Sequence, residues 1–321
     1  MSKPAPQASL VVPLYNEEES ITHLHNAIHD ALDPSGIDYE IIFVNDGSRD
    51  RTAELGTELA KADPRLRFID FRKNYGQTPA MAAGIDNARG KILITMDGDL
   101  QNDPTDIPMM IAKLQEGYDI VVGWRHNRQD KLVSRKIPSM IANRLIGKVT
   151  GVPIKDNGCS LKVYRADVMQ RMPFYNEMHR FIPALLSLSG AKVAEVKVNH
   201  HARQFGESKY GLSRVYKVLL DLLTMKTILS LVDHPTAWFS KIALLPAFLM
   251  LISLFIMAGQ LASGDSIVVM TSVATLFFSL SVFLVSLGFL CEMIYQRSDM
   301  KVDQLALLAA ESIPATKRNQ V

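Results

Sequence analysis

The strongest constraint on the fold is a pair of long uncharged runs near the end of the chain. Residues 243–262 and 267–291 contain no Asp, Glu, Lys, Arg or His. Each run reaches the roughly 20 residues that a helix needs to cross a bilayer. A buried helix pair in a soluble core is the alternative, but uncharged runs this long are rare there. We therefore predict a hairpin of two transmembrane helices over residues 236–295.

The charges around the predicted hairpin indicate its orientation. Lys241 and Arg297 flank it, whereas the connecting loop, residues 263–266, carries neither Lys nor Arg. Positive charge marks the cytoplasmic side of membrane helices, and the amino-terminal residues lack the apolar segment of a signal peptide. We therefore expect a multi-pass protein of the inner (cytoplasmic) membrane, with the amino-terminal domain and both termini in the cytoplasm.

The composition excludes one class of partner and indicates a compartment. A formal net charge of +2 over 321 residues does not suggest a nucleic-acid binder, so we predict no nucleic-acid partner. The two cysteines, Cys159 and Cys291, fall in different predicted domains and fit a reducing compartment rather than a disulfide.

Short apolar runs alternate with helical segments through residues 1–212, which we predict to form one cytoplasmic domain. This alternation is typical of a doubly wound, mostly parallel α/β sheet. The chain has neither a glycine-rich dinucleotide motif after its first strand nor a P-loop, which argues against those two nucleotide-binding classes. The predicted strands cover residues 9–14, 39–45, 66–71, 92–96, 119–123, 161–164 and, at an edge, 192–198.

Helical patterns identify further segments. Asn16 is predicted to cap the first helix, and the Ala- and Gly-rich residues 78–88 to form a helix that packs closely on the sheet. Residues 213–235 combine apolar and charged side chains at helical spacing, which predicts amphipathic interfacial helices. A basic stretch, residues 128–136, leads into an amphipathic segment, 137–146, which we expect to lie on the membrane surface or to be an ordinary solvated helix. Residues 296–321 form the predicted cytoplasmic tail.

Two acids, Asp97 and Asp99, follow the predicted strand at 92–96. Ligands of open α/β sheets bind beyond the carboxyl ends of the strands, and Gly98 lets the backbone bend so that the two carboxylates converge. Mg²⁺ or Mn²⁺ suits such a pair, because it takes its other ligands from water and substrate phosphates. Turns also favour Asp and Gly, so the motif by itself indicates either a cation site or a solvated turn.

Four motifs occur in order along the chain, followed by the predicted hairpin. They are V-V-P-L-Y-N-E-E at 11–18, V-N-D-G-S at 44–48, D-G-D-L-Q at 97–101 and R-x-x-G-x-S-K-Y at 203–210. Together they resemble the family 2 glycosyltransferases, which have a GT-A fold. With the hairpin, the chain is similar to their polyprenyl-phosphate branch, which includes bacterial bactoprenol glucosyltransferases and dolichol-phosphate mannose synthases. The Q-x-x-R-W motif of processive synthases is absent.

The resemblance implies a Rossmann-like GT-A domain and roles for individual residues. It assigns the nucleotide to Pro13, Tyr15, Glu17, Asp46 and Asp97, and the metal, Mg²⁺ or Mn²⁺, to Asp97, Asp99 and Gln101. It assigns the acceptor phosphate to Arg125, Arg135, Arg203 and Ser208. It assigns catalysis to Asp99, Arg125, Arg203 and Lys209.

The resemblance also implies an activity. By this resemblance, we expect an inverting glycosyltransferase that moves a hexose, glucose from UDP-glucose, to undecaprenyl phosphate for later cell-envelope glycosylation. Other sugars stay open, namely N-acetylglucosamine, mannose and aminoarabinose, because hydroxyl recognition depends on loop geometry. A diacylglycerol or protein acceptor is another alternative, and a catalytically inactive membrane-anchored binding protein is a third. Small residues in the hairpin also allow a homo-oligomer.

The expected acceptor determines whether a catalytic base is needed. A sugar hydroxyl must lose a proton to a base, whereas a phosphate monoester has a second pKa of about 6 and is mostly dianionic at pH 7. Repulsion between this dianion and the donor diphosphate is then the obstacle. We therefore expect cationic side chains to promote the reaction without a base, and we interpret Asp156, the nearest acid available for that role, as a turn residue.

Overall fold

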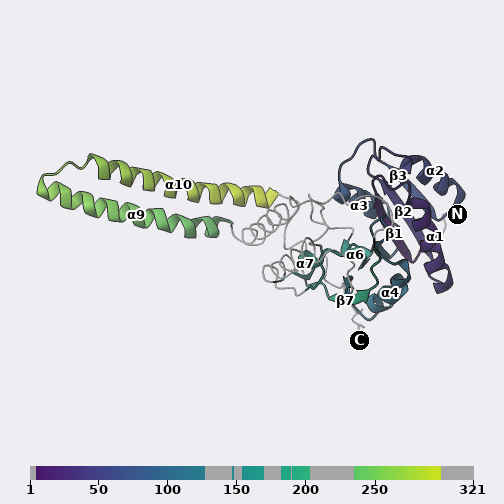
Figure 1. The fold of residues 1–321 in the computed structure, drawn as a ribbon. Coiled ribbons are helices and arrows are strands. Elements are labelled where there is room, and N and C mark those ends of the chain that lie inside the picture. The colour runs from purple at the N-terminus through teal and green to yellow at the C-terminus, as the bar shows by residue number, and fades with distance from the viewer. Residues whose placement is uncertain are drawn as a thin grey trace, which may run out of the picture. The chain divides into compact units, whose positions relative to one another are not determined.

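The structure, a computed structural model, describes residues 5–126, 147, 154–169, 182–188, 190–202 and 235–297. The chain divides into two compact units, whose described parts are residues 5–202, with the gaps given above, and residues 235–297. The first unit is an α/β domain and the second is a pair of long helices (Figure 1).

A seven-stranded sheet forms the centre of the α/β domain, in the order β3-β2-β1-β4-β6-β5-β7. β6 is antiparallel to both of its neighbours, and every other neighbouring pair is parallel. The predicted mostly parallel sheet is thus confirmed, with β7 at an edge. The strands are β1 (Ala8–Leu14), β2 (Tyr39–Asn45), β3 (Leu66–Asp70), β4 (Ile92–Thr95), β5 (Ile120–Arg125), β6 (Lys162–Arg165) and β7 (Val193–Val198).

The core of this domain lies around the central strands. Every residue of β1 and β2 is buried, which fits their largely apolar sequences. α1 (Ile21–Leu32) buries residues three or four positions apart, and these form one apolar stripe. Each such side chain contributes about 1.5–3 kcal/mol on burial, so the stripe fixes the helix against the core. Its buried residues are Ile21, Leu24, Ile28 and Leu32.

The helix predicted at 78–88 is present as α3 (Gln77–Asp86). Gly84 allows its close approach to the sheet, because a side-chain Cβ there would lie 2.3 Å from Val11 Cγ1. The other described helices of this domain are α2 (Thr52–Ala62), α4 (Ile107–Gln115), α6 (Ala166–Met169) and α7 (Ile182–Leu188), with 3-10 turns at Asp33–Ser35 and Pro104–Asp106.

The predicted helix cap at Asn16 is wrong. α1 begins later, at Ile21, and Asn16 has a φ of 53°, a left-handed conformation that Asn tolerates. Its Oδ1 accepts a hydrogen bond from the Arg49 backbone N–H at 2.9 Å, and its own N–H donates to Ser48 Oγ at 2.9 Å. Asn16 therefore joins the loops that follow β1 and β2.

The second unit consists of α9 (Pro235–Ser263) and α10 (Val268–Arg297). The two helices run side by side (Figure 1). By length and composition, both are apolar enough to cross a membrane. The predicted pair of apolar helices is confirmed.

Small and polar residues hold this helix pair together. A side-chain Cβ at Gly288 would lie 3.0 Å from Phe239 Cβ, so the backbones approach closely there. Thr236 Oγ1 donates to Gly288 O at 3.4 Å, and Ser281 Oγ donates to Ala243 O at 3.3 Å. Close approach at small residues and hydrogen bonds between helices are typical of membrane helix pairs.

Several predicted features lie outside the described residues and stay predictions from the sequence. They are segment 137–146, the interfacial helices before Pro235, the tail after Arg297, and the site candidates Arg135, Arg203, Ser208 and Lys209.

Candidate functional site

The carboxyl ends of β1, β2 and β4 lie together at one edge of the sheet, here called the carboxyl edge. Asp97 and Asp99 follow β4 at this edge. A side-chain Cβ at Gly98, between them, would lie 2.5 Å from Leu14 Cδ2. Gly98 therefore lets the turn pack against Leu14 without displacing that side chain, which keeps both acids close to the end of β1.

The two acids have different hydrogen-bond partners. Asp99 is buried, and its Oδ1 accepts from the Gln101 backbone N–H at 3.2 Å. Part of Asp97 is exposed, and its Oδ1 accepts from Gln77 Nε2 at 2.7 Å. Desolvation of its carboxyl group, followed by the charge of Asp99, raises the pKa of Asp97. A nearby cation would offset both effects, and carboxylate oxygens are the ligands that Mg²⁺ and Mn²⁺ prefer, so the residues fit a divalent ion.

Asp46 is linked to Asp97 by hydrogen bonds that run through the residues at the start of α3. It is buried after β2, and its Oδ1 and Oδ2 accept from the backbone N–H groups of Tyr75 at 2.7 Å and Gly76 at 2.9 Å. Gly76 directly precedes Gln77, which donates to Asp97. The Asp46 carboxylate thus orders the loop that positions Gln77, and its predicted contact with the nucleotide stays a prediction.

The other residues predicted to bind the nucleotide lie at the same edge. Pro13 is buried near the end of β1, opposite Val44 of β2. Tyr15 and Glu17 come directly after the strand and are partly exposed. The Glu17 N–H donates to Thr52 Oγ1 at 2.8 Å, which ties this segment to the start of α2. The fold therefore gathers all five predicted nucleotide residues at the carboxyl edge, and their roles stay predictions.

β6 brings two residues to this edge that the sequence analysis missed. Because β6 is antiparallel to β4, with Lys162 opposite Thr95, the beginning of β6 lies at the carboxyl edge. Ser160, two residues earlier, forms a hydrogen bond with Asp97. Lys162 is buried, and burial lowers its pKa to about 8. The sequence does contain a feature that could have indicated this position, namely a lysine inside the predicted strand 161–164.

Arg125, at the end of β5, forms a two-point ion pair with Asp156. Its Nε donates to Asp156 Oδ2 at 2.8 Å and its Nη2 to Oδ1 at 2.9 Å. Asp156 is 2% exposed, so this acid is a buried ion-pair partner and not only a turn residue. Removing one member of a buried pair costs about 3–5 kcal/mol. Arg125 thus stabilises the domain here, and its predicted contact with the acceptor phosphate stays a prediction.

The segment that leads to Arg203 is bound to the chain that follows Asp99. The His201 N–H donates to Gln101 O at 2.9 Å, and His201 Nε2 lies 3.1 Å from Asp103 Oδ2. The Asn199 N–H donates to Asp106 Oδ2 at 2.7 Å. The described chain ends at residue 202, so the R-x-x-G-x-S-K-Y motif begins one residue after a segment held beside the acidic pair.

Comparison with known proteins agrees with this architecture. Residues 9–173 match Glycosyl transferase family 2. Dodecaprenyl-phosphate galacturonate synthase from Rhizobium johnstonii is 43% identical over 303 residues, which cover 91% of this chain and 90% of that protein.

Two solved structures share the fold. Mannosyl-3-phosphoglycerate synthase from Rubrobacter xylanophilus has a TM-score of 0.57 at 14% identity, covering 70% of this chain and 75% of that one. Glucosyl-3-phosphoglycerate synthase from Mycobacterium tuberculosis, in complex with Mn²⁺, uridine-diphosphate and glucosyl-3-phosphoglycerate, has a TM-score of 0.53 at 16% identity, covering 69% and 80%. At identities of 14% and 16%, this likeness shows a shared GT-A fold and nothing beyond it. The family match and the 43% identity over most of both chains establish that this protein belongs to glycosyl transferase family 2.

Proposed function

We propose that this glycosyltransferase inverts the anomeric centre as it moves a sugar from a nucleotide sugar to a polyprenyl phosphate at the cytoplasmic membrane face. One observation carries the proposal: hydrogen bonds connect the acidic pair Asp97 and Asp99 both to the Asp46–Gln77 segment and, through Gln101, to residues 199–202. A diphosphate at the acidic pair would have the predicted nucleotide residues on one side and the Arg203 motif on the other. The relative's name, a dodecaprenyl-phosphate synthase, supports the acceptor class.

The donor sugar is the finer part of the proposal. The same relative makes a galacturonate product by its name, so we propose a hexuronic acid, galacturonate, as the transferred sugar. Glucose from UDP-glucose, the sugar expected from the family resemblance, gains no support from this relative and becomes the comparison substrate. A single changed substituent in a polar sugar pocket can alter selectivity by orders of magnitude, so the two donors are readily distinguished.

The acidic pair and its neighbours would act on the donor diphosphate. Asp97 and Asp99 would hold the divalent ion, and Gln77 would orient Asp97 through its 2.7 Å hydrogen bond. Mg²⁺ or Mn²⁺ bound there would neutralise charge on the leaving diphosphate. Lys162 would add positive charge near Asp97, and Arg203 and Lys209 would meet the phosphates from the motif at 203–210.

The same proposal needs no catalytic base. The acceptor dianion is already a nucleophile at neutral pH, since its second pKa is about 6. Arg203→Ala should then abolish most turnover while the protein stays folded. A kcat that still falls as a base on the enzyme becomes protonated, with acceptor saturating, would contradict this mechanism.

The hairpin would anchor the domain where the acceptor phosphate lies. α9 and α10 are apolar enough to span the membrane, and a prenyl chain would stay in lipid while its phosphate reaches the protein. Deleting residues 236–321 should leave nucleotide binding intact and lower transfer to a long-chain acceptor. Normal transfer by the truncated protein in membranes would reject this role for the hairpin.

The direct test is a panel of labelled nucleotide sugars with dodecaprenyl and undecaprenyl phosphate in detergent. Product should appear in the lipid extract with UDP-galacturonate and at least about tenfold less with UDP-glucose. Preference for UDP-glucose would restore the sequence-based expectation. Label in the protein or diacylglycerol fraction would change the acceptor class. Turnover with none of the donors would favour a binding protein.

A further inference from the structure

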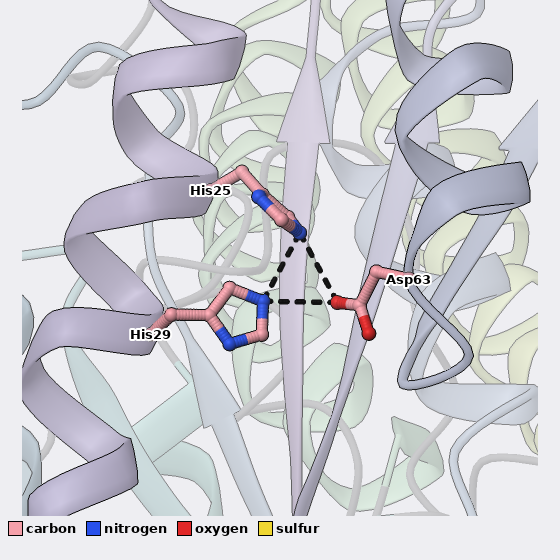
Figure 2. Close-up of side chains that lie close together, drawn as sticks. All are labelled: His25, His29 and Asp63. Atoms are coloured by element: carbon pink, nitrogen blue, oxygen red, sulfur yellow. Dashed lines mark hydrogen bonds and ion pairs between the residues drawn. The ribbon is translucent and has the colours of Figure 1, made fainter.

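A second cluster of metal-ligating side chains is present in the α/β domain. His25 and His29 lie one turn apart on α1, and Asp63 directly follows α2. Asp63 Oδ2 is 3.1 Å from His25 Nε2 and 2.9 Å from His29 Nε2, and the two Nε2 atoms are 3.0 Å apart. Figure 2 shows the three side chains, which come from two separate elements, pointing toward one another. Three potential ligand atoms thus converge.

This cluster is separate from the candidate active site. α2 ends at Ala62 and β3 begins at Leu66. Asp63 therefore lies in the connection that leads into the beginning of a parallel strand, at the amino edge of the sheet, opposite the carboxyl edge with Asp97 and Asp99. The predicted donor and acceptor residues make no use of the cluster.

The spacing and chemistry of the three atoms suit a transition metal. With bonds of about 2.0–2.1 Å, ligand atoms around tetrahedral Zn²⁺ lie about 3.3 Å from one another. The observed separations of 2.9–3.1 Å need only a small expansion to reach that value. Imidazole nitrogens favour Zn²⁺ and similar metals over Mg²⁺ or Ca²⁺. The side chains of His25, His29 and Asp63 keep 11–16% of their surface exposed, which leaves access for an ion and a water ligand.

Neighbouring groups orient the ligands. Asp63 Oδ1 accepts from the Arg65 backbone N–H at 2.9 Å, which leaves Oδ2 facing the histidines. His29 Nδ1 lies 2.7 Å from the Tyr39 hydroxyl, which donates to Asp33 Oδ1 at 2.7 Å. Metal-bound histidines usually donate their second ring N–H to such a partner. Arg65 Nη2, also 2.7 Å from His29 Nδ1, would then turn away, and its Nη1 keeps a 2.7 Å bond to Asp33 Oδ1.

We propose that His25, His29 and Asp63 bind a zinc-type divalent ion that joins α1 to the connection between α2 and β3. The ion would link positions 38 residues apart in the chain, with three side-chain ligands and one water. It would act as a structural brace for this part of the domain, because a metal that binds only the folded state stabilises that state. Without an ion, the same atoms form a cluster in which two histidines and an acid share protons.

The test compares four full-length proteins, purified in detergent and stripped of metal with a chelator. They are the wild type, His25→Gln, Asp63→Asn and the control His23→Gln, an exposed histidine of the same helix. His25 suits substitution because its Nδ1 has no hydrogen-bond partner within the described part of the chain, so its polar contacts go through Nε2. Zn²⁺ affinity is measured by competition with a chromophoric chelator, and the midpoint of thermal unfolding is followed with and without Zn²⁺.

The wild type and His23→Gln should bind Zn²⁺ equally, and both should melt at a higher temperature with it. His25→Gln and Asp63→Asn should bind at least about 100-fold more weakly and show no thermal gain. Equal affinity in all four proteins would overturn the proposal and leave a proton-sharing cluster.

Cobalt substitution tests the site without any mutation, in case a variant does not fold. Co²⁺ with four ligands including imidazole absorbs visible light strongly, whereas octahedral Co²⁺ with oxygen ligands absorbs weakly. A strong band in wild-type protein supports the site, and a weak one rejects it. Neither readout depends on transferase activity, so failure of the proposed function leaves this test unaffected.

Discussion

Glu40 and Asp97 are acids near opposite ends of the same sheet, and their surroundings differ in charge. Glu40, at the amino edge, accepts from Arg89 Nε at 2.9 Å and Nη2 at 2.6 Å, and from Ser9 Oγ at 2.7 Å. Asp97, at the carboxyl edge, accepts from the neutral amide of Gln77 and lies beside Asp99. Burial raises the pKa of both groups, but the Arg89 and Ser9 hydrogen bonds outweigh it and lower the pKa of Glu40.

This difference distinguishes a charge that is neutralised within the fold from charges that would suit a bound cation. At the amino edge, the guanidinium of Arg89 neutralises a carboxylate within the protein itself. At the carboxyl edge, burial and then the charge of Asp99 raise the pKa of Asp97, and a bound cation would offset both effects. Perturbed acids cluster at functional sites for this reason. Substitutions at the two edges should therefore change different properties of the protein.

Asp99→Asn should have the largest effect and should act on turnover. If Asp99 ligates the metal, loss of its charge should lower kcat by about 10²-fold or more, with the midpoint of thermal unfolding nearly unchanged. Chelator should likewise abolish wild-type turnover until Mg²⁺ or Mn²⁺ is restored. Asp86→Asn, which alters an exposed acid at the end of α3, is the control. Wild-type turnover in folded Asp99→Asn would remove this residue from the site.

Glu40→Gln should act on stability, by about 2 kcal/mol in the free energy of unfolding, because a charged hydrogen-bond acceptor is lost. The pKa of Glu40 lies below its ordinary value of 4.5 in the folded state. The contribution of the Glu40 carboxylate to stability is therefore fully present above pH 4.5 and is lost as the pH falls through the folded-state pKa. Denaturant titrations at pH 7 and below pH 4 should show the wild-type advantage shrinking, while turnover per folded molecule at pH 7 stays the same. An equal difference at both pH values would contradict this account.

Gln77→Leu should have a smaller effect. It tests whether the hydrogen bond from Gln77 to Asp97 matters for metal binding at the carboxyl edge. Removing the hydrogen bond that orients Asp97 should weaken Mg²⁺ or Mn²⁺ affinity about tenfold, which is about 1.4 kcal/mol. The measurement is the metal concentration at half-maximal turnover. An unchanged metal concentration at half-maximal turnover would show that Asp97 binds metal without being oriented by Gln77. Gln77→Glu should partly restore metal binding if charge matters more than orientation.

Arg89→Lys should have the smallest effect. It keeps a positive charge near Glu40 but loses the two-point contact that the guanidinium makes. Because Arg89 is exposed, the cost should be about 0.5–1 kcal/mol, measured as a shift in the denaturant midpoint. A loss as large as that of Glu40→Gln would mean that the geometry of the pair matters more than its charge.

The strands were predictable because continuous apolar runs closed by turn residues dictate buried strands whatever their partners. Chain direction within the sheet was not, because the run at 161–164 carries no sign of whether β6 pairs parallel or antiparallel. The cap at Asn16 failed for a related reason. Its hydrogen bonds go to Ser48 and Arg49, more than 30 positions away, and these contacts override the local capping preference.

The candidate site was predictable where a motif carries its own geometry. Asp97, Gly98 and Asp99 lie together in sequence and in space. Asp156, Ser160 and Lys162 come from a segment that only the sheet order brings to the carboxyl edge. His25 and His29 show helical spacing in the sequence, but Asp63 joins them only through the packing of α1 and α2.

The antiparallel direction of β6 determines which of its two flanking segments lies at the carboxyl edge. In a fully parallel sheet, the residues after each strand would border the substrates. Here the residues before β6, 156–160, lie at the carboxyl edge instead, and the residues after it leave from the opposite edge. Substitution of Asp167, an exposed residue of α6 just after β6, should therefore leave catalysis unchanged. A single-residue deletion before Lys162 would instead shift every side chain of β6 by one position in register.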